Sequence, residues 1–190
     1  MESAPRFVYA EARMKLHRTV ALVGMMGAGK TSIGRKLAAQ LEVPFRDADH
    51  EIEAAAGLTV SEIFARFGEP YFRDGERRVI ARLLGEAPHV LATGGGAFMD
   101  ETTRAAMRNS AFTIWLKAPI ALLLSRVKKR ETRPLLKDAD PRQTLERLLE
   151  LRQPVYALAD MTVEITDEAG GSALETIVTS LHERKLCEES

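Results

Sequence analysis

The amino-acid sequence predicts a three-layer α/β fold in which helices cover both faces of a five-stranded parallel sheet. Five short apolar runs rich in β-branched residues are typical of buried parallel strands. These runs alternate with amphipathic segments of helical periodicity, the pattern of parallel strands joined by helices. Glycine-rich turns end the first and third runs. No repeat, low-complexity stretch or second domain is evident in the 190 residues.

Each predicted strand is a short apolar run bounded by glycine, proline or charged residues. The first, Thr-Val-Ala-Leu-Val, stops at Gly24. The second starts around Pro44 and is expected to end in Asp47-Ala-Asp49, so that both aspartates lie on extended chain. The expected strands are residues 19–23, 43–49, 89–93, 111–116 and 161–165.

The predicted helices carry apolar side chains at intervals of three and four residues, as Ile33, Leu37 and Leu41 do in the first of them. A glycine, Gly57, stops the second, and Thr59 opens the third. The expected helices are residues 32–41, 51–56, a helix opening at 59–61, 71–84, 120–128, 143–158 and 172–183. Residues 132–140 carry a proline and dense charge and are expected to form a loop.

The amino-acid composition argues against some classes of binding partner. The 27 Lys and Arg residues balance the 27 Asp and Glu residues, so the chain has no general basic field for nucleic acid or an anionic membrane. No apolar run reaches the roughly 18 residues of a membrane helix, and the cytoplasm is the expected location. The single cysteine, Cys187, excludes an intrachain disulfide and a Cys-rich metal site, and we expect it to be a tail thiol without a role.

The first 17 residues are predicted to be a poorly ordered extension or an added short helix, followed by a single domain over 18–190. Their mixed charge and lack of a continuous apolar core do not fit a signal peptide. Basic residues leave a transit peptide open as an alternative, although Glu2 and Glu11 argue against one.

The turn after the first strand predicts a phosphate-binding loop. Residues 24–31 read Gly-Met-Met-Gly-Ala-Gly-Lys-Thr and fit the pattern G-x-x-x-x-G-K-[ST] in full. In such a loop backbone N–H groups point at phosphate oxygens, Lys30 reaches the β- and γ-phosphates, and the Thr31 hydroxyl binds Mg²⁺. The alternative is an ordinary glycine turn, but the position between a buried strand and an amphipathic helix is the one that the motif requires.

Two acids follow the second strand at the edge of the sheet where open α/β folds bind ligands. Asp47 and Asp49 are expected to face one site, where a carboxylate supports a divalent ion or accepts the proton of a substrate hydroxyl. The alternative is that one of them only caps the next helix. The third strand ends in Gly94-Gly95-Gly96, where many P-loop proteins carry an aspartate for Mg²⁺, so Asp47 is the nearest candidate ligand.

Several arginines accompany these motifs without a general basic excess. Arg73 lies three residues before Glu76, and Arg126, Arg133 and Arg152 follow in the second half of the chain. Isolated arginines are usually solvated, but a site that holds phosphate gives planar guanidinium groups a function.

Taken in order, these motifs resemble shikimate kinase, a family of P-loop proteins similar to nucleoside monophosphate kinases. The resemblance runs from about residue 19 to residue 181. It is carried by the P-loop, Asp47-Ala-Asp49, Phe72-Arg73-x-x-Glu76, Gly94-Gly95-Gly96, Arg133-Pro-Leu-Leu and Leu151-Arg152-x-Pro-x-Tyr156. The family implies a sheet order of 2-3-1-4-5 in chain numbering, a monomer, and ATP-dependent phosphorylation of shikimate to shikimate 3-phosphate in aromatic amino-acid (chorismate) biosynthesis.

The resemblance also implies a role for each motif residue. Asp49 would bind the accepting hydroxyl and act as, or near, the general base. Arg133 would come from a mobile lid, at about residues 128–142, and stabilise the transferring phosphate together with Lys30. The substrate-binding segment would lie at about residues 48–78. The residues implied for shikimate are Asp49, Arg73, Gly94, Gly95, Gly96 and Arg152; those for ATP are Gly27, Ala28, Gly29, Lys30, Thr31, Ser32, Arg126 and Arg133; those for Mg²⁺ are Thr31 and Asp47.

Further implied roles are supporting ones. Glu76 would orient the substrate-binding arginine, and Phe64 and Phe72 would shape the pocket. Arg126 would stack on adenine, and the stretch around Thr166 and Asp167 would form the far side of the adenine pocket.

Three alternatives to this interpretation stay open at the level of sequence. The first is another small-molecule kinase, such as gluconate kinase, whose P-loop is similar. An adenylate-kinase-like enzyme would need a nucleotide as acceptor. A nucleotide-binding module without catalysis would be expected to have lost Asp49 or Arg133, and both are present.

Overall fold

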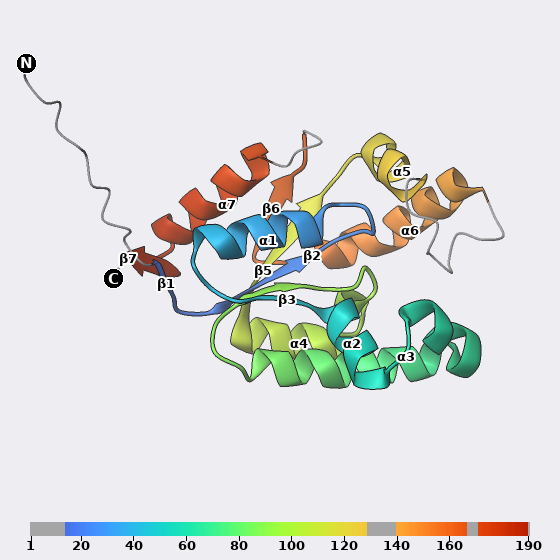
Figure 1. Ribbon diagram of the computed structural model, residues 1–190. Coiled ribbons are helices and arrows are strands. Elements are labelled where there is room, and N and C mark those ends of the chain that lie inside the picture. Colours follow the sequence, from blue (N-terminus) through green and yellow to red (C-terminus); the bar gives the residue numbers. More distant parts are fainter. Residues whose placement is uncertain (1–13, 129–139, 167–170, 190) are drawn as a thin grey trace, which may run out of the picture.

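The computed structural model of the chain describes residues 14–128, 140–166 and 171–189 (Figure 1). Its strands are β1 Met14–Leu16, β2 Thr19–Val23, β3 Phe45–Asp47, β4 Val90–Ala92, β5 Ala111–Lys117, β6 Met161–Glu164 and β7 Cys187–Glu189. Its helices are α1 Lys30–Gln40, α2 Ala48–Ala56, α3 Val60–Leu84, the short 3₁₀ helix η1 Ala97–Met99, α4 Glu101–Ser110, α5 Ile120–Lys128, α6 Pro141–Tyr156 and α7 Gly171–Glu183.

The main sheet has five parallel strands in the order β3-β4-β2-β5-β6. Numbered along the chain as predicted, this is 2-3-1-4-5, so the expected fold and strand order are confirmed. The central strand β2 is buried along its whole length, which explains its continuous apolar sequence. Because all five strands are parallel, the turns that follow β2, β3 and β4 meet at one edge of the sheet.

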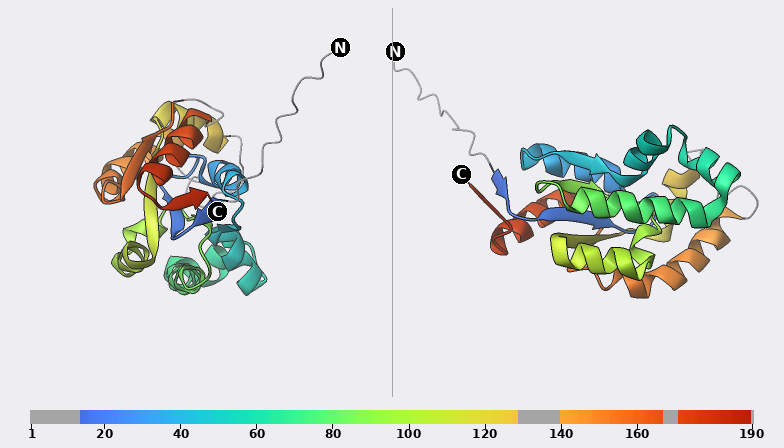
Figure 2. Two further views of the ribbon diagram at one scale, coloured as in Figure 1. Left: turned by 90° about the vertical axis from the view of Figure 1, so that its left-hand side faces the viewer. Right: turned by 90° about the horizontal axis from the view of Figure 1, so that it is seen from below.

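Helices cover both faces of this sheet. In Figure 1, α1 and α7 lie on one face and α3 and α4 on the other, and the turned views of Figure 2 show the same three layers. Leu37 of α1 and Ile80 of α3 are almost fully buried against strand residues such as Leu22 and Leu91. Within the described parts of the chain, no helix is both long and apolar enough to cross a membrane.

A small second sheet, which the sequence analysis does not predict, joins two segments from opposite ends of the chain. β1 pairs antiparallel with β7, with Met14 opposite Glu189 and Leu16 opposite Cys187. The expectation for Cys187 is therefore corrected, because this residue is a buried strand position in the hydrophobic core rather than a tail thiol. Residues 14–16 likewise form a strand, although we expected an extension or a helix there.

Two helical regions also differ from the prediction. The separate helices expected at 59–61 and 71–84 join across a kink at Gly68, where the backbone has φ 79° and Pro70 follows. Thr59 caps the combined helix α3 through a reciprocal pair of bonds with Glu62. Helix α4 was not predicted. Asp100 starts it by accepting a hydrogen bond from the backbone N–H of Thr103.

Candidate active site

The predicted phosphate loop curls between β2 and α1. Gly29, at the N-terminal end of α1, has φ 99°, a left-handed conformation that favours glycine. A Cβ atom on Gly24 would lie 2.7 Å from the carbonyl oxygen of Leu116, so only glycine fits there. Ala28 is fully buried, and Ser32 is exposed in the first turn of α1.

The Lys30 side chain lies over this loop. Its ammonium group donates to the carbonyl oxygens of Gly24 at 2.8 Å and Met25 at 2.9 Å, and the residue is buried. Arg126 of α5 approaches the same loop and donates from Nη1 to the carbonyl oxygen of Gly27 at 3.1 Å. Two cations thus contact a loop whose shape is suited to phosphate.

Thr31 and Asp47, the residues predicted to hold Mg²⁺, lie in contact. The Thr31 hydroxyl donates to Asp47 Oδ2 at 2.8 Å, while Asp47 Oδ1 accepts the backbone N–H of Asp49 at 3.2 Å and caps α2. Asp47 therefore does cap α2, but the cap occupies one carboxylate oxygen and leaves the other facing the P-loop. Hard oxygen donors of this kind are the ligands that Mg²⁺ prefers.

Asp49 does not lie on strand β3 as predicted. It lies in the first turn of α2, because the Asp47 cap turns the chain into a helix immediately after the strand. The carboxylate lies beside the glycine turn: a Cβ atom built on Gly94 would lie 3.0 Å from Asp49 Oδ1 and 2.5 Å from Glu76 Oε1. Two carboxylates from different helices therefore flank the glycine turn after β4, which has no room for a side chain at Gly94.

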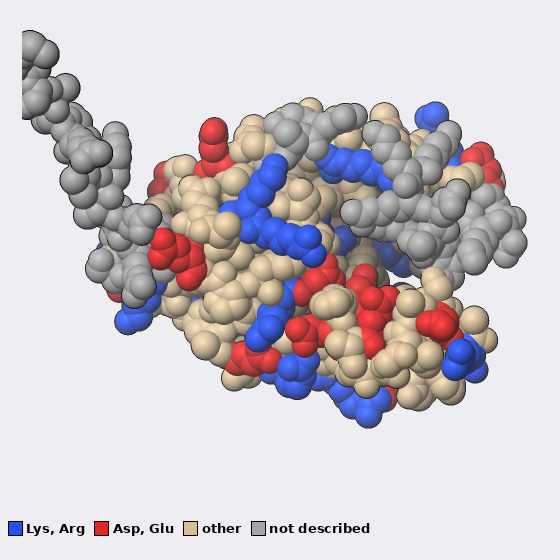
Figure 3. All heavy atoms as spheres, viewed as in Figure 1, with Lys and Arg blue, Asp and Glu red and all other residues tan. Residues whose placement is uncertain are grey.

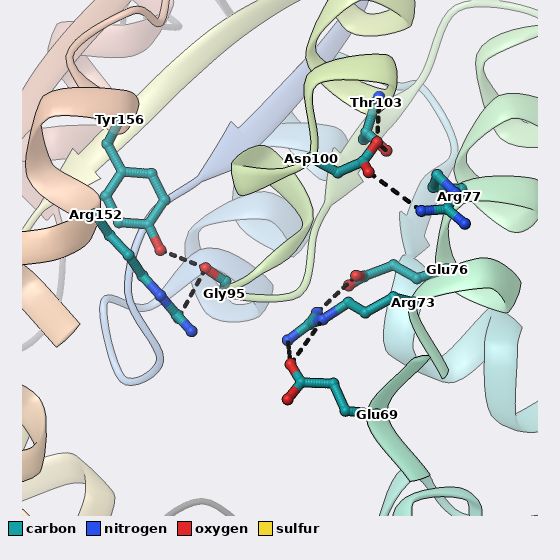
Figure 4. Close-up of polar contacts among 9 residues, drawn as sticks. All are labelled: Glu69, Arg73, Glu76, Arg77, Gly95, Asp100, Thr103, Arg152 and Tyr156. Atoms are coloured by element: carbon teal, nitrogen blue, oxygen red, sulfur yellow. Dashed lines mark hydrogen bonds and ion pairs between the residues drawn. The ribbon is translucent and has the colours of Figure 1, made fainter. Parts of the chain in front are cut away.

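Glu76 is almost fully buried and holds Arg73 (Figure 4). Arg73 Nη1 donates to Glu76 Oε2 at 2.7 Å, and Nε and Nη2 donate to Glu69 Oε1 at 3.1 and 3.0 Å. Burial raises the pKa of Glu76, the ion pair with Arg73 opposes this, and the charges of Asp49 and Asp100 add to the rise. Glu76 Oε1 has no hydrogen-bond partner among the described residues.

The Gly94–Gly96 turn receives arginines from two helices. A Cβ atom on Gly96 would lie 2.5 Å from both Nη1 and Nη2 of Arg73, so that guanidinium rests directly on the turn. On the opposite side, Arg152 of α6 donates from Nη1 to the Gly95 carbonyl oxygen at 3.1 Å (Figure 4). The structure therefore brings Arg73 and Arg152 together around one backbone turn, although 79 positions of sequence numbering separate them.

Sequence reasoning left one residue of this site without a role. Tyr156 appears in the motif Leu-Arg-x-Pro-x-Tyr, and in the structure its hydroxyl donates to the same Gly95 carbonyl oxygen as Arg152. The four-residue spacing from Arg152 was the available signal, since it places both side chains on one face of a helix.

The two aromatic residues expected to shape the pocket contact each other, and several other predicted residues lie outside the described part of the chain. Phe64 and Phe72 contact with ring centroids 4.7 Å apart. Thr166 is described, with its hydroxyl 3.4 Å from Ser172 Oγ. Arg133, most of the predicted lid, Asp167 and residues 1–13 lie outside the described residues.

The charges around the site are divided between elements. In the view of Figure 3, Lys and Arg side chains lie over α1, and Asp and Glu side chains gather over α2. This local separation occurs in a chain whose formal net charge is zero. Cations on the P-loop side and carboxylates on the α2 side suit a reaction in which a phosphate group meets a hydroxyl.

Comparison with known proteins identifies the family. A family model described as shikimate kinase matches residues 26–182. The shikimate kinase of Caulobacter vibrioides is 55% identical over 166 residues, which cover 87% of this chain and 83% of that protein. The shikimate kinase of Bradyrhizobium diazoefficiens is 55% identical over 172 residues, covering 90% and 83%.

The chain belongs to the shikimate kinase family. Among solved structures, the shikimate kinase from Acinetobacter baumannii in complex with shikimate has a TM-score of 0.85 and 38% identity, covering 89% of this chain and 95% of that one. A gluconokinase from Sinorhizobium meliloti reaches a TM-score of 0.54 at 16% identity, covering 90% and 98%, and shares the fold alone. The resemblance drawn from the motifs is confirmed, and the shikimate kinase family uses ATP.

Proposed function

We propose that this chain transfers the γ-phosphoryl group of ATP to the 3-hydroxyl of shikimate and releases ADP and shikimate 3-phosphate. One observation carries the proposal beyond family membership. Arg73 and Arg152 reach the Gly94–Gly96 turn from opposite sides, next to Asp49. This arrangement offers two guanidinium groups to a carboxylate and one carboxylate to a hydroxyl, and shikimate carries both of these groups.

The acceptor side would orient the substrate. Arg73 and Arg152 would bind the shikimate carboxylate, with Arg73 held in place by its ion pair to Glu76. Backbone N–H groups of the Gly94–Gly96 turn would contact the substrate, because glycine allows the closest approach. Asp49 would accept the proton of the attacking hydroxyl as its oxygen bonds to the γ-phosphorus.

The donor side would hold ATP and neutralise charge. Backbone N–H groups of residues 27–32 would bind the phosphates, and Arg126 would stack on adenine. The bond from the γ-phosphorus to the β,γ-bridging oxygen breaks as the new bond forms, so negative charge moves onto ADP. Lys30 would leave its loop carbonyls to stabilise this charge, and Arg133 would stabilise it from the lid.

Thr31 and Asp47 would hold Mg²⁺, which supplies charge neutralisation and orientation of the phosphates when bound. The 2.8 Å contact between the two oxygen-bearing side chains at the P-loop supports this assignment. The working unit in this proposal is a monomer.

A coupled assay of ADP release tests the function. Purified protein is supplied with Mg²⁺ and ATP and with shikimate, gluconate or no acceptor. We expect turnover with shikimate alone. Turnover with gluconate instead would keep the ATP site but remove the acceptor roles of Arg73 and Arg152. ATP binding without turnover on either acceptor would favour a nucleotide-binding module without catalysis.

A further inference from the structure

The carbonyl oxygen of Gly95 accepts hydrogen bonds from two side chains of one helix. Arg152 donates from Nη1 at 3.1 Å, and the Tyr156 hydroxyl donates to the same oxygen (Figure 4). Both residues lie on α6, one turn apart. A carbonyl oxygen has two lone pairs, so these two donors satisfy it completely.

The Ala97 N–H donates to the Gly94 carbonyl oxygen at 3.2 Å and closes the turn, but such a bond is compatible with either orientation of the central peptide unit. The unit between Gly95 and Gly96 is flanked by residues without Cβ atoms, so steric repulsion leaves its orientation nearly free. The described chain contains no cis peptide bond, and in a trans unit the Gly96 N–H points opposite to the Gly95 carbonyl. Directing the carbonyl toward α6 therefore directs the Gly96 N–H away from α6.

The Gly96 N–H belongs to the turn proposed to contact the acceptor. The Arg73 guanidinium lies directly on Gly96, so a carboxylate held by that guanidinium would lie next to the turn. A rotated peptide unit would present a carbonyl oxygen in place of a donor. The orientation of one peptide plane thus decides whether the turn attracts or repels a carboxylate.

Tyr156 is placed to set this orientation without contacting solvent. The residue is fully buried, and its ring stacks on Trp115 with centroids 5.8 Å apart and planes 28° apart. Its hydroxyl also lies 3.8 Å from Met25 Sδ in the P-loop. Burial raises the pKa of Tyr156 to about 12, so the phenol stays neutral and remains a donor near neutral pH.

We propose that Tyr156 is a positioning residue for the acceptor: its hydroxyl fixes the Gly95 peptide unit so that the turn and Arg152 present donors to a carboxylate. The proposal rests on the proposed function, since shikimate supplies that carboxylate. Arg152 alone is insufficient for this task, because its guanidinium must also turn toward the substrate, whereas the buried phenol has only Arg152 itself and the weak acceptor Met25 Sδ as further partners.

The test is Tyr156→Phe, which removes one oxygen and keeps the stacked ring. Loss of a single buried hydrogen bond predicts a rise of roughly 10-fold in KM for shikimate, with KM for ATP changed by less than about 2-fold. Calorimetric titration with shikimate alone should show a similar loss of affinity. The matched control is Thr113→Val, which removes another buried hydroxyl, one bonded to Asp160 Oδ2 at 2.7 Å and lying away from the glycine turn.

The control separates positioning from stability. We expect both variants to lower Tm, but only Tyr156→Phe to change KM for shikimate. An unchanged KM for shikimate in Tyr156→Phe would overturn the role of Tyr156. So would a rise in both KM values that Thr113→Val reproduces. In either case, turnover by the wild-type chain with shikimate would still uphold the proposed function. A wild-type chain that neither phosphorylates nor binds shikimate would overturn both.

Discussion

The donor side and the acceptor side of the active site are constructed in opposite ways. The donor side is one continuous turn, residues 24–31, whose conformation is held by glycine geometry and by Lys30 bonding to the carbonyls of its own loop. The acceptor side has no such continuous segment. It collects single side chains from α2, α3 and α6 around the glycine turn after β4.

This difference indicates that specificity for the acceptor lies on the acceptor side. A backbone cradle contacts only the phosphate groups of a nucleotide, so it does not select the acceptor. The acceptor side depends on a few side chains whose positions are fixed by one another. Substitutions there should therefore change binding of shikimate and leave ATP binding intact, and substitutions on the donor side should do the reverse.

The largest expected effect is on turnover, at the point where the two sides meet. Asp49→Asn keeps the shape of the side chain but removes the proposed proton acceptor, so kcat should fall by roughly 100-fold or more while ATP affinity stays near normal. Steady-state assays and nucleotide titration measure the two quantities. Glu101→Gln, at an exposed acid in the first turn of α4, is the control. Near-normal turnover would remove Asp49 from the role of base.

A second prediction concerns a substitution that should weaken shikimate binding and leave ATP binding unchanged. Arg152→Lys keeps the charge but loses the planar fork that bonds Gly95 and, by the proposed role, the substrate carboxylate, so KM for shikimate should rise roughly 10-fold. KM for ATP should stay within about 2-fold of wild type. Arg147→Lys, an exposed position on the same helix, provides the matched control. A parallel rise in KM for ATP would contradict the division between the two sides.

The converse prediction concerns Arg126 on the donor side. Arg126→Ala removes a guanidinium that contacts the Gly27 carbonyl and, by the proposed role, stacks on adenine. KM for ATP should rise roughly 5-fold, the scale of one cation–π contact, with KM for shikimate unchanged. Arg108→Ala, at an exposed arginine in the last turn of α4, serves for comparison. If KM for shikimate rose instead, the assignment of Arg126 to ATP would be wrong.

The smallest expected effect is on stability. Burial raises the pKa of Glu76 above that of an unfolded glutamate, so its protonated form is favoured in the fold. This contribution is complete below the unfolded pKa and is lost as pH rises through the folded pKa. The neutral variant Glu76→Gln should therefore gain Tm relative to wild type, by a few degrees, as pH rises above about 4, the ordinary pKa of a glutamate.

Thermal unfolding at a series of pH values measures the difference. Glu69→Gln, whose more exposed carboxylate also bonds Arg73, controls for loss of an arginine partner. A Tm difference between wild type and Glu76→Gln that stays constant with pH would show that the ion pair with Arg73 cancels the effect of burial on the pKa of Glu76. A gain in Tm of wild type over the variant as pH rises would show that the ion pair outweighs burial.

The donor side could be predicted from sequence because its chemistry is local. Eight adjacent residues form the P-loop, and the apolar strand and amphipathic helix beside them specify its setting. The acceptor residues Arg73 and Arg152 could be named only through the family resemblance. Their meeting at Gly95 and Gly96 depends on packing between elements far apart in the chain, which periodicity does not report.

The errors in prediction have physical causes of the same kind. Asp47-Ala-Asp49 is compatible with a strand end or a helix start, and the bond from Asp49 N–H to Asp47 Oδ1 decides for the helix. The pairing of β1 with β7 joins segments at opposite ends of the sequence, so neither strand carries a local signal of its partner. From sequence alone, Tyr156 looks like an ordinary aromatic residue of the core, because the sequence does not show that its hydroxyl contacts the Gly95 carbonyl oxygen.

The pairing of β1 with β7 also sets how the fold responds to force. Met14 lies opposite Glu189, and Leu16 opposite Cys187, so the outermost pair of residues is also nearest to the two ends of the chain. Tension applied between those ends loads the hydrogen bonds of this ribbon one after another rather than all together. The molecule should therefore unzip at low force from its ends, before the parallel sheet that carries the active site bears any load.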